Sequence, residues 1–220
     1  GTESGGGKHT LYGLDQSNDI RIGLHFGITD KLMVGVARYK RMENFEGFLK
    51  YRILEQTQDD HVPLALTAFS NVALSAVAGE VIERNTDRLT YHSSLIIARK
   101  FSPGFSLAAG GGFLHRNITA DGDPSDLFSF QAGVRWRFTK SASVLADYSH
   151  AFGREELLPD YQDVIGGGLE LETGGHVFTI MLTTASGLME NDFLVNTLDS
   201  WSKGGMKFSF IISRVFGLKK

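Results

Sequence analysis

The chain has 220 residues, no cysteine, a formal net charge of −3 at pH 7 and a mean hydropathy of −0.08. This composition excludes disulfides, thiolate metal sites, c-type haem attachment and a lipid-modified cysteine anchor, and the charge gives no reason to expect a nucleic-acid partner. No stretch holds the roughly 18 apolar residues that a membrane helix needs. A membrane β-barrel is not excluded, because its strands alternate and their average hydropathy is ordinary.

Alternation of apolar and polar residues predicts eleven strands in a single domain, residues 1–220. The alternation starts after a glycine-rich polar stretch, residues 1–18, which we expect to be an external loop. Each strand is near the length that a tilted strand needs to cross a bilayer. In chain order the expected strands are residues 20–26, 32–39, 45–53, 62–76, 89–101, 105–116, 127–138, 142–151, 164–172, 176–185 and 206–216.

The strand expected at residues 127–138 shows the pattern most clearly. Phe128, Phe130 and Trp136 fall on one parity, whereas Arg135 and Arg137 fall on the other. Successive side chains of a strand point to opposite faces, so this strand has an aromatic face and a charged face. Such a two-faced strand is the unit of an outer-membrane barrel.

Each parity has an expected environment. Charged side chains are expected to face the lumen, because a charge at the bilayer midplane costs about 2–4 kcal/mol. These lumen-facing candidates are Arg21, His25, Glu46, Lys50, Arg52, Arg135, Arg137, Asp147, Glu170, Glu172 and Lys207. The candidates expected to face lipid are Ile20, Ile22, Leu24, Phe128, Phe130, Val134, Trp136, Phe208, Phe210 and Ile212.

The links between the strands alternate in length. Those after residues 26, 101, 138 and 172 are short, and those after residues 76, 116, 151 and 186 are long. Two links depart from the pattern, because 57–61 is somewhat longer than the other short links and 40–43 is short. Bacterial outer-membrane barrels combine short periplasmic turns with long external loops and an even strand number. We therefore predict an all-β, antiparallel, up-and-down transmembrane barrel of about twelve strands, with one strand and a signal peptide expected before Gly1. Within the longest link, residues 187–204, a short helix is a candidate at 188–201.

Aromatic residues near the expected strand ends are typical of the interfacial girdles of membrane barrels. They are Phe26, Tyr39, Phe101, Phe105, Phe138, Phe152 and Phe216. The alternative is a soluble barrel whose apolar face points inward. That alternative predicts neither the placement of the aromatics nor the alternation of short and long links.

Several short segments, taken in order, resemble a known family of uncharacterised outer-membrane β-barrel proteins of Bacteroidota, classified as a domain of unknown function. The segments that carry the resemblance are 11–15 (LYGLD), 20–24 (IRIGL), 27–30 (GITD), 46–51 (EGFLKY), 97–101 (IARKF), 172–178 (ETGGHVF) and 212–216 (ISRVF). The resemblance covers nearly the whole chain and implies a bacterial outer-membrane location, with a signal peptide and a strand upstream. The family has no assigned reaction, so it implies no catalytic residue.

We expect no catalytic site. Some twelve-stranded outer-membrane barrels are phospholipases that use a serine–histidine pair, and residues 147–150 (DYSH) offer these residue types. However, Ser149 and His150 are adjacent in a strand and point to opposite faces, so they cannot pair with each other. A partner on another strand is not singled out by the sequence.

We expect no metal or cofactor site either. The seven histidines are scattered, and the aspartate-rich segment 121–126 lacks the remaining ligand positions of a calcium loop, so it is interpreted as a solvated external loop. The glycine triplets 110–112 and 166–168 lie inside strands without a following helix. They indicate close packing, strand bending or lumen space rather than phosphate binding.

The sequence thus predicts a non-enzymatic barrel with a polar, largely side-chain-filled lumen, serving as a membrane anchor or as a subunit of a cell-envelope assembly. A narrow passive channel for small polar solutes is the first alternative, and an outer-membrane lipid-modifying enzyme is the second. The expected partners are outer-membrane lipid or lipopolysaccharide and other envelope proteins.

Overall fold

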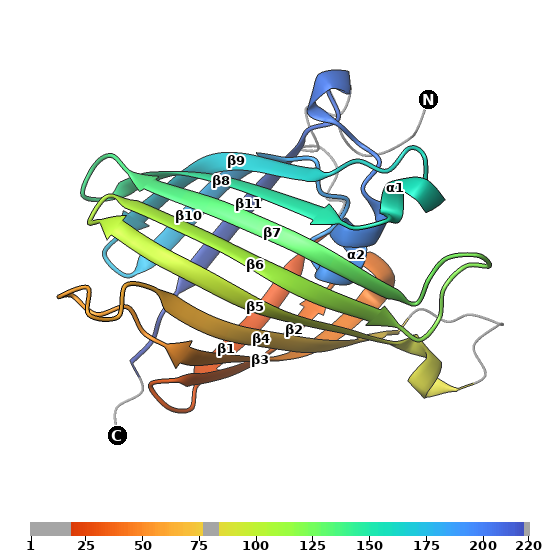
Figure 1. Ribbon diagram of the computed structural model, residues 1–220, viewed down its shortest axis with the longest axis horizontal. Coiled ribbons are helices and arrows are strands. Elements are labelled where there is room, and N and C mark those ends of the chain that lie inside the picture. Colours follow the sequence, from red (N-terminus) through yellow and green to blue (C-terminus); the bar gives the residue numbers. More distant parts are fainter. Residues whose placement is uncertain (1–18, 77–83, 218–220) are drawn as a thin grey trace.

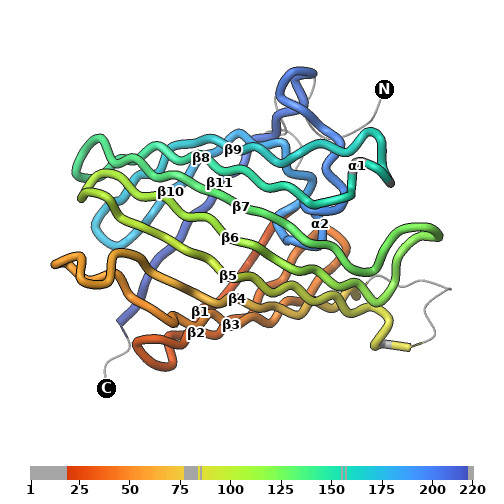
Figure 2. Tube along the Cα trace, in the orientation of Figure 1, coloured from red at the N-terminus to blue at the C-terminus, as the bar shows by residue number. Residues whose placement is uncertain are grey.

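The computed structural model describes residues 19–76 and 84–217 of the chain. Within these ranges eleven strands form one antiparallel sheet in which each strand pairs with its neighbours in sequence (Figures 1 and 2). The strands are β1 Arg21–Gly27, β2 Leu32–Tyr39, β3 Asn44–Leu54, β4 Ala65–Ser75, β5 Leu89–Ser102, β6 Phe105–Arg116, β7 Asp126–Arg137, β8 Ala142–Ala151, β9 Val164–Thr173, β10 His176–Thr183 and β11 Lys207–Arg214. The predicted up-and-down β architecture is confirmed.

The sheet curves into a barrel-like wall, as Figure 1 shows. Within the described residues β1 and β11 do not pair, so the wall is not closed. The predicted external loop at 1–18 lies outside the described residues.

The two ends of the wall differ. Short turns join β1 to β2, β5 to β6, β7 to β8 and β9 to β10, although the link between β3 and β4 at this end spans residues 55–64. The opposite end carries most of the longer links and, among the described residues, all the helical segments. These are η2 Arg41–Glu43, η3 Asn85–Arg88, α1 Arg154–Leu157, α2 Glu190–Asn196 and η4 Trp201–Lys203. A helix within residues 188–201 is confirmed by α2. Among the described residues, none of the helices has the length and apolar character required to cross a membrane.

Most strands expose one parity more than the other, as the period of two requires, whereas every residue of β1 is exposed. In β7, for example, Phe128 is 64% exposed, whereas Leu127 and Ser129 on either side are buried. One exception concerns the expected aromatic girdle. Tyr39 is 3% exposed and its hydroxyl donates a 2.8 Å hydrogen bond to Glu46, so its assignment to a girdle is wrong. Tyr39 lies at the end of β2, but its odd number places its side chain on the inward parity of that strand. It therefore points into the barrel and not toward a membrane interface.

Candidate functional site

The charged residues of the inward parity pair with one another across the strands. Arg135 Nη2 lies 2.6 Å from Glu170 Oε1, and Arg137 Nη2 lies 3.2 Å from Glu172 Oε2, so both pairs join β7 to β9 over β8. Mutual pairing lowers the cost of placing these charges along the inner wall. The two pairs line the half of the barrel near the short turns.

A second cluster surrounds Glu46 on β3. Arg21 Nη2 lies 3.5 Å from Glu46 Oε2, and the amide Nδ2 of Asn71 on β4 donates to Glu46 Oε1 at 2.8 Å. Arg21 also donates to the Tyr39 hydroxyl, and its guanidinium lies 3.4 Å from His25 Nε2. The buried carboxylate of Glu46 therefore has hydrogen-bond donors from β2 and β4 and an ion-pair partner from β1.

The remaining lumen-facing candidates are not brought into these clusters. Arg52 pairs with Glu55 at 2.8 Å, and Lys207 binds Asp199 and the Thr184 carbonyl. Lys50 and Asp147 form no ion pair with another residue in the described ranges. The eleven residues predicted to face the lumen therefore do not form one cluster, and the structure divides them among several local networks.

The ten candidates expected to face lipid lie on the opposite parity. All are exposed except Val134 and Phe208, which are half-buried. Aromatic and branched aliphatic side chains thus form the surface of the wall opposite to the ion pairs.

The link between β10 and β11 contains a helix that lies inside the barrel. We call residues 187–197, which include α2, the plug. Figure 1 shows α2 within the curve of the sheet, at the end that carries the longer links. Leu194 is fully buried and Val195 is 2% exposed, so the wall encloses this face of the helix.

Three apolar side chains fix the plug to different parts of the wall. Met189 packs with Ala37, Tyr39 and Ala73 on β2 and β4. On the other side, Val195 packs with side chains of β6 and β7, and Leu194 packs with β8 and the link that follows it. The plug therefore bridges the lumen from one wall to the other.

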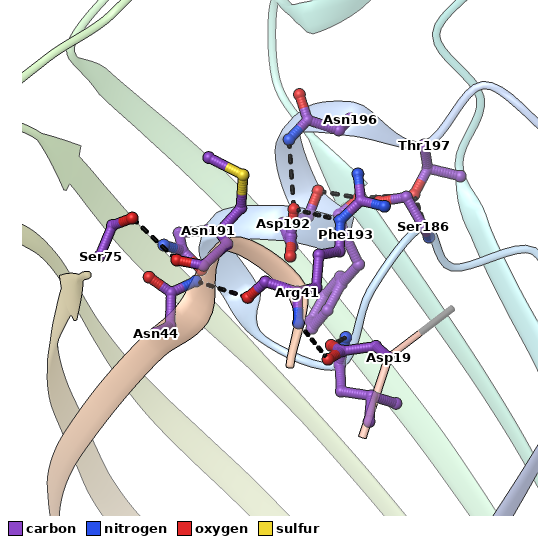
Figure 3. Close-up of polar contacts among 12 residues, drawn as sticks. Asp19, Arg41, Asn44, Ser75, Ser186, Asn191, Asp192, Phe193, Asn196 and Thr197 are labelled. Atoms are coloured by element: carbon purple, nitrogen blue, oxygen red, sulfur yellow. Dashed lines mark hydrogen bonds and ion pairs between the residues drawn. The ribbon is translucent and has the colours of Figure 1, made fainter. Parts of the chain in front are cut away.

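Polar contacts fix the same helix. Glu190 Oε2 accepts a 3.0 Å hydrogen bond from Asn71, and Asn191 Nδ2 donates to the Thr90 hydroxyl at 2.9 Å. Figure 3 shows Arg41 of η2 beside Asp192, with 3.0 Å between Nε and Oδ1. Buried polar groups are costly unless they are hydrogen-bonded, so these contacts favour one docked position of the helix.

The rim above the plug contains a buried cluster of charged residues. Arg154 of α1 donates from Nε to the Val195 carbonyl at 2.9 Å and also contacts Asp123, which Arg116 binds at 2.9 Å. Burial alone would raise the pKa of Asp123, but the hydrogen bonds and positive charges of Arg116 and Arg154 lower it below its ordinary value. The expectation that segment 121–126 is a wholly solvated loop is wrong for Asp123, because two arginines hold it against the rim.

Among the titratable groups of the plug, Glu190 has the pKa that differs most from its ordinary value. Burial, assisted by the negative charge of Glu46, raises its pKa to about 7, although a backbone hydrogen bond, the hydrogen bond from Asn71 and the charge of Arg21 each lower the pKa. The amide of Asn71 donates to both carboxyl groups. A neutral Glu190 fits this position better than an ionised one, because two buried carboxylates would otherwise repel each other.

The glycine triplets have a packing role in the structure. A Cβ atom on Gly112 would lie 2.6 Å from His92 Nε2 and 2.7 Å from Ser129 Oγ, and one on Gly166 would lie 2.5 Å from Asp147 Oδ1. Glycine thus leaves room for inward side chains of neighbouring strands. This contact agrees with close packing as the interpretation of the triplets.

The Ser149 and His150 side chains lie on opposite faces of β8, as alternation requires. Ser149 is buried, and His150 Nδ1 lies 2.8 Å from Asp163 Oδ1. In the described parts of the chain, no group of three or more histidine, cysteine or acidic residues could hold a metal ion.

Sequence reasoning missed the residues that hold the plug, chiefly Asn71, Arg41, Arg154 and Asp192. The helical signal of the link is visible in the sequence, since Met189, Phe193 and similar residues recur at helical spacing. The same signal is compatible with a helix on the outside of the barrel. The sequence therefore did not indicate on which side of the barrel wall the helix lies.

Comparison with known proteins shows the family to which the chain belongs. Residues 2–216 match the family described as "Membrane bound beta barrel domain (DUF5777)". No curated protein matches the chain. Among solved structures, the toluene transporter TodX of Pseudomonas putida is similar at 14% sequence identity and a TM-score of 0.35, over 74% of this chain and 42% of the transporter. The chain thus spans less than half the length of that transporter, and a likeness at this TM-score is too distant to carry a functional inference.

Proposed function

The chain belongs to the family of membrane-bound β-barrel domains, and on that premise we propose that it is a non-enzymatic barrel of the bacterial outer membrane whose lumen is closed by the plug. Its short turns face the periplasm and its longer links face outward, as in other bacterial barrels. Its apolar parity contacts lipid or lipopolysaccharide. The Bacteroidota origin, the signal peptide and the twelfth strand stay predictions.

The observation that carries this proposal is the docking of α2 across the lumen. A solute passing along the axis would have to displace Met189, Leu194 and Val195 from three separate apolar contacts. A barrel closed in this way supports a role as a membrane anchor or as a subunit of an envelope assembly.

A narrow channel is the second candidate, and a hollow favours it. A cavity of about 470 Å³ lies in the short-turn half, where Ala65, Ala98, Ala108 and Gly133 leave space beside Lys100. In this alternative the plug is a gate that must leave the lumen before solutes pass. An outer-membrane lipid-modifying enzyme is the third candidate, and lipase activity that is lost on substitution of one serine would support it.

Replacing residues 187–204 by a short Gly-Ser link is expected to open the barrel. The substitution is compatible with the fold because Thr183 of β10 pairs with Lys207 of β11, so a tight turn can join the two strands. In planar bilayers at about pH 5, we expect the unaltered protein to show no conductance and the shortened protein to show steady channels.

A matched control replaces residues 118–122, in a link that carries no plug, and should stay silent. Steady conductance by the unaltered protein at about pH 5 would contradict a closed lumen. A shortened protein that retains its β-sheet circular dichroism but stays silent would contradict the plug as the closing element.

A further inference from the structure

The second half of the link between β10 and β11 lies on the other side of the barrel wall. The indole Nε1 of Trp201 in η4 donates a 3.0 Å hydrogen bond to the Ile165 carbonyl on β9. A Cβ on Gly167 would lie 4.0 Å from the same indole ring. Ile165 is exposed, whereas its neighbours Val164 and Gly166 are buried, so Trp201 rests on the outer face of β9.

This half of the link is a compact turn, which we call the rim turn and define as residues 198–203. The Gly204 amide donates to the Trp201 carbonyl at 3.0 Å, and the Gly205 amide donates to the Ser200 carbonyl at 2.9 Å. Figure 1 shows the turn standing out from the wall beside β9, away from the barrel interior. Residues of one link therefore lie both inside and outside the rim.

The rim turn exposes an amphipathic set of side chains. Leu198 is 44% exposed and Trp201 is 40% exposed, although Trp201 also contacts the wall. Lys203 is exposed at the end of the same turn. An indole whose N–H is satisfied, next to an aliphatic group and a cation, has the composition found at membrane interfaces.

The turn also continues the apolar outer wall. Gly167, beneath the indole, pairs with Leu182 of β10, and Leu182 pairs with Phe208 of β11. Farther along the same wall, Leu169 and Phe210 are exposed. Because the turn stands out sideways at the end of this surface, the proposed orientation of the barrel places it at the level where acyl chains meet headgroups.

We propose that the rim turn is a lipid anchor, in which Leu198 and Trp201 enter the boundary between headgroups and acyl chains and Lys203 contacts lipid phosphate. This inference rests on the proposed orientation of the barrel in the membrane. Lys203 can extend to the phosphate while its aliphatic stem covers apolar surface. The anchor holds the link at the rim from outside, while the plug holds it from inside.

Fluorescence quenching tests the anchor, because the chain has only two tryptophans. Trp136 lies on the outward parity of β7 and is 57% exposed. The variants Trp201→Phe and Trp136→Phe each keep one indole. In vesicles of phosphatidylcholine with brominated acyl chains, we expect both single tryptophans to lose emission relative to unbrominated vesicles, and to a comparable extent.

The two tryptophans separate the possible failures. Quenching of Trp136 without quenching of Trp201 would overturn the lipid anchor and leave the proposed orientation intact, and shielding of Trp201 by a co-purifying protein would do the same. Absence of quenching at both positions would overturn the orientation and the anchor together. As a second variant, Leu198→Ser in the Trp136→Phe background should reduce the quenching of Trp201 if the turn enters the bilayer.

Discussion

Substituting alanine for Leu194 is expected to weaken the docking of α2 by about 2–5 kcal/mol, the usual cost of truncating a fully buried leucine. Leu194 packs with Ala151 and Tyr161, with Leu158 and Phe193 beside it. Because each 1.4 kcal/mol is a factor of about ten, the helix should leave the lumen more than tenfold more often. Hydrogen exchange of the α2 amides measures this opening directly.

Leu188 provides the matched control for this substitution. It is the same residue type, lies two positions before the first residue of α2 and is 40% exposed. Leu188→Ala should change the opening free energy by no more than about 0.5 kcal/mol, as surface substitutions usually do. Equal effects of the two substitutions on α2 exchange would show that Leu194 is not enclosed by the wall.

Opening of the plug is also expected to depend on pH through Glu190. Its pKa is raised from an ordinary value of 4.5 to about 7 in the docked state. The contribution of the neutral side chain to docking is therefore complete below about pH 4.5 and is lost as the pH rises through about 7. At about 1.4 kcal/mol per pH unit, docking should become about 3 kcal/mol less favourable over this range.

Burial sets the sign of this effect, and the charged groups facing Glu190 modify its size. Glu46 on β3 repels the ionised side chain, and Arg21 on β1 attracts it. Asn71 on β4 donates to both carboxyl groups and does not titrate. Because burial and Glu46 together outweigh Arg21, alkaline pH favours opening.

The variant Glu190→Gln keeps the size of the side chain and removes its titration. In planar bilayers, channel openings of the unaltered protein should become more frequent between about pH 5 and about pH 8.5, whereas Glu190→Gln should respond little. Glu43→Gln, at an exposed position in η2, should behave like the unaltered protein. An equal pH response in Glu190→Gln would assign the titration to another group.

The strands could be predicted from sequence because their signal is local. Three strands, Leu32–Tyr39, Phe105–Arg116 and Ala142–Ala151, have the predicted bounds, and the others differ by a few residues at their ends. Side-chain alternation needs only the residues of one strand, and each link length is read from the chain directly. For the glycine triplets the sequence left close packing, strand bending and lumen space open, and the contacts around Gly112 favour close packing.

The closure of the lumen could not be predicted, because it depends on contacts between distant residues. Arg41 and Asp192 lie 151 positions apart, and Asn71 and Glu190 lie 119 apart. Nothing in the composition of the link distinguishes a helix docked in the lumen from one lying on a membrane surface. The structure assigns one half of the link to each side of the wall.

Chemical accessibility of a single cysteine tests the central claim, the position of α2 in the lumen, most directly. The chain has no cysteine, so Val195→Cys and Asp160→Cys each introduce one thiol, the first on the enclosed face of α2 and the second at an exposed position of the rim. With a bulky polyethylene-glycol maleimide, we predict rapid labelling of Asp160→Cys and very slow labelling of Val195→Cys until the protein is denatured. Equal labelling rates in the folded barrel would contradict an enclosed helix.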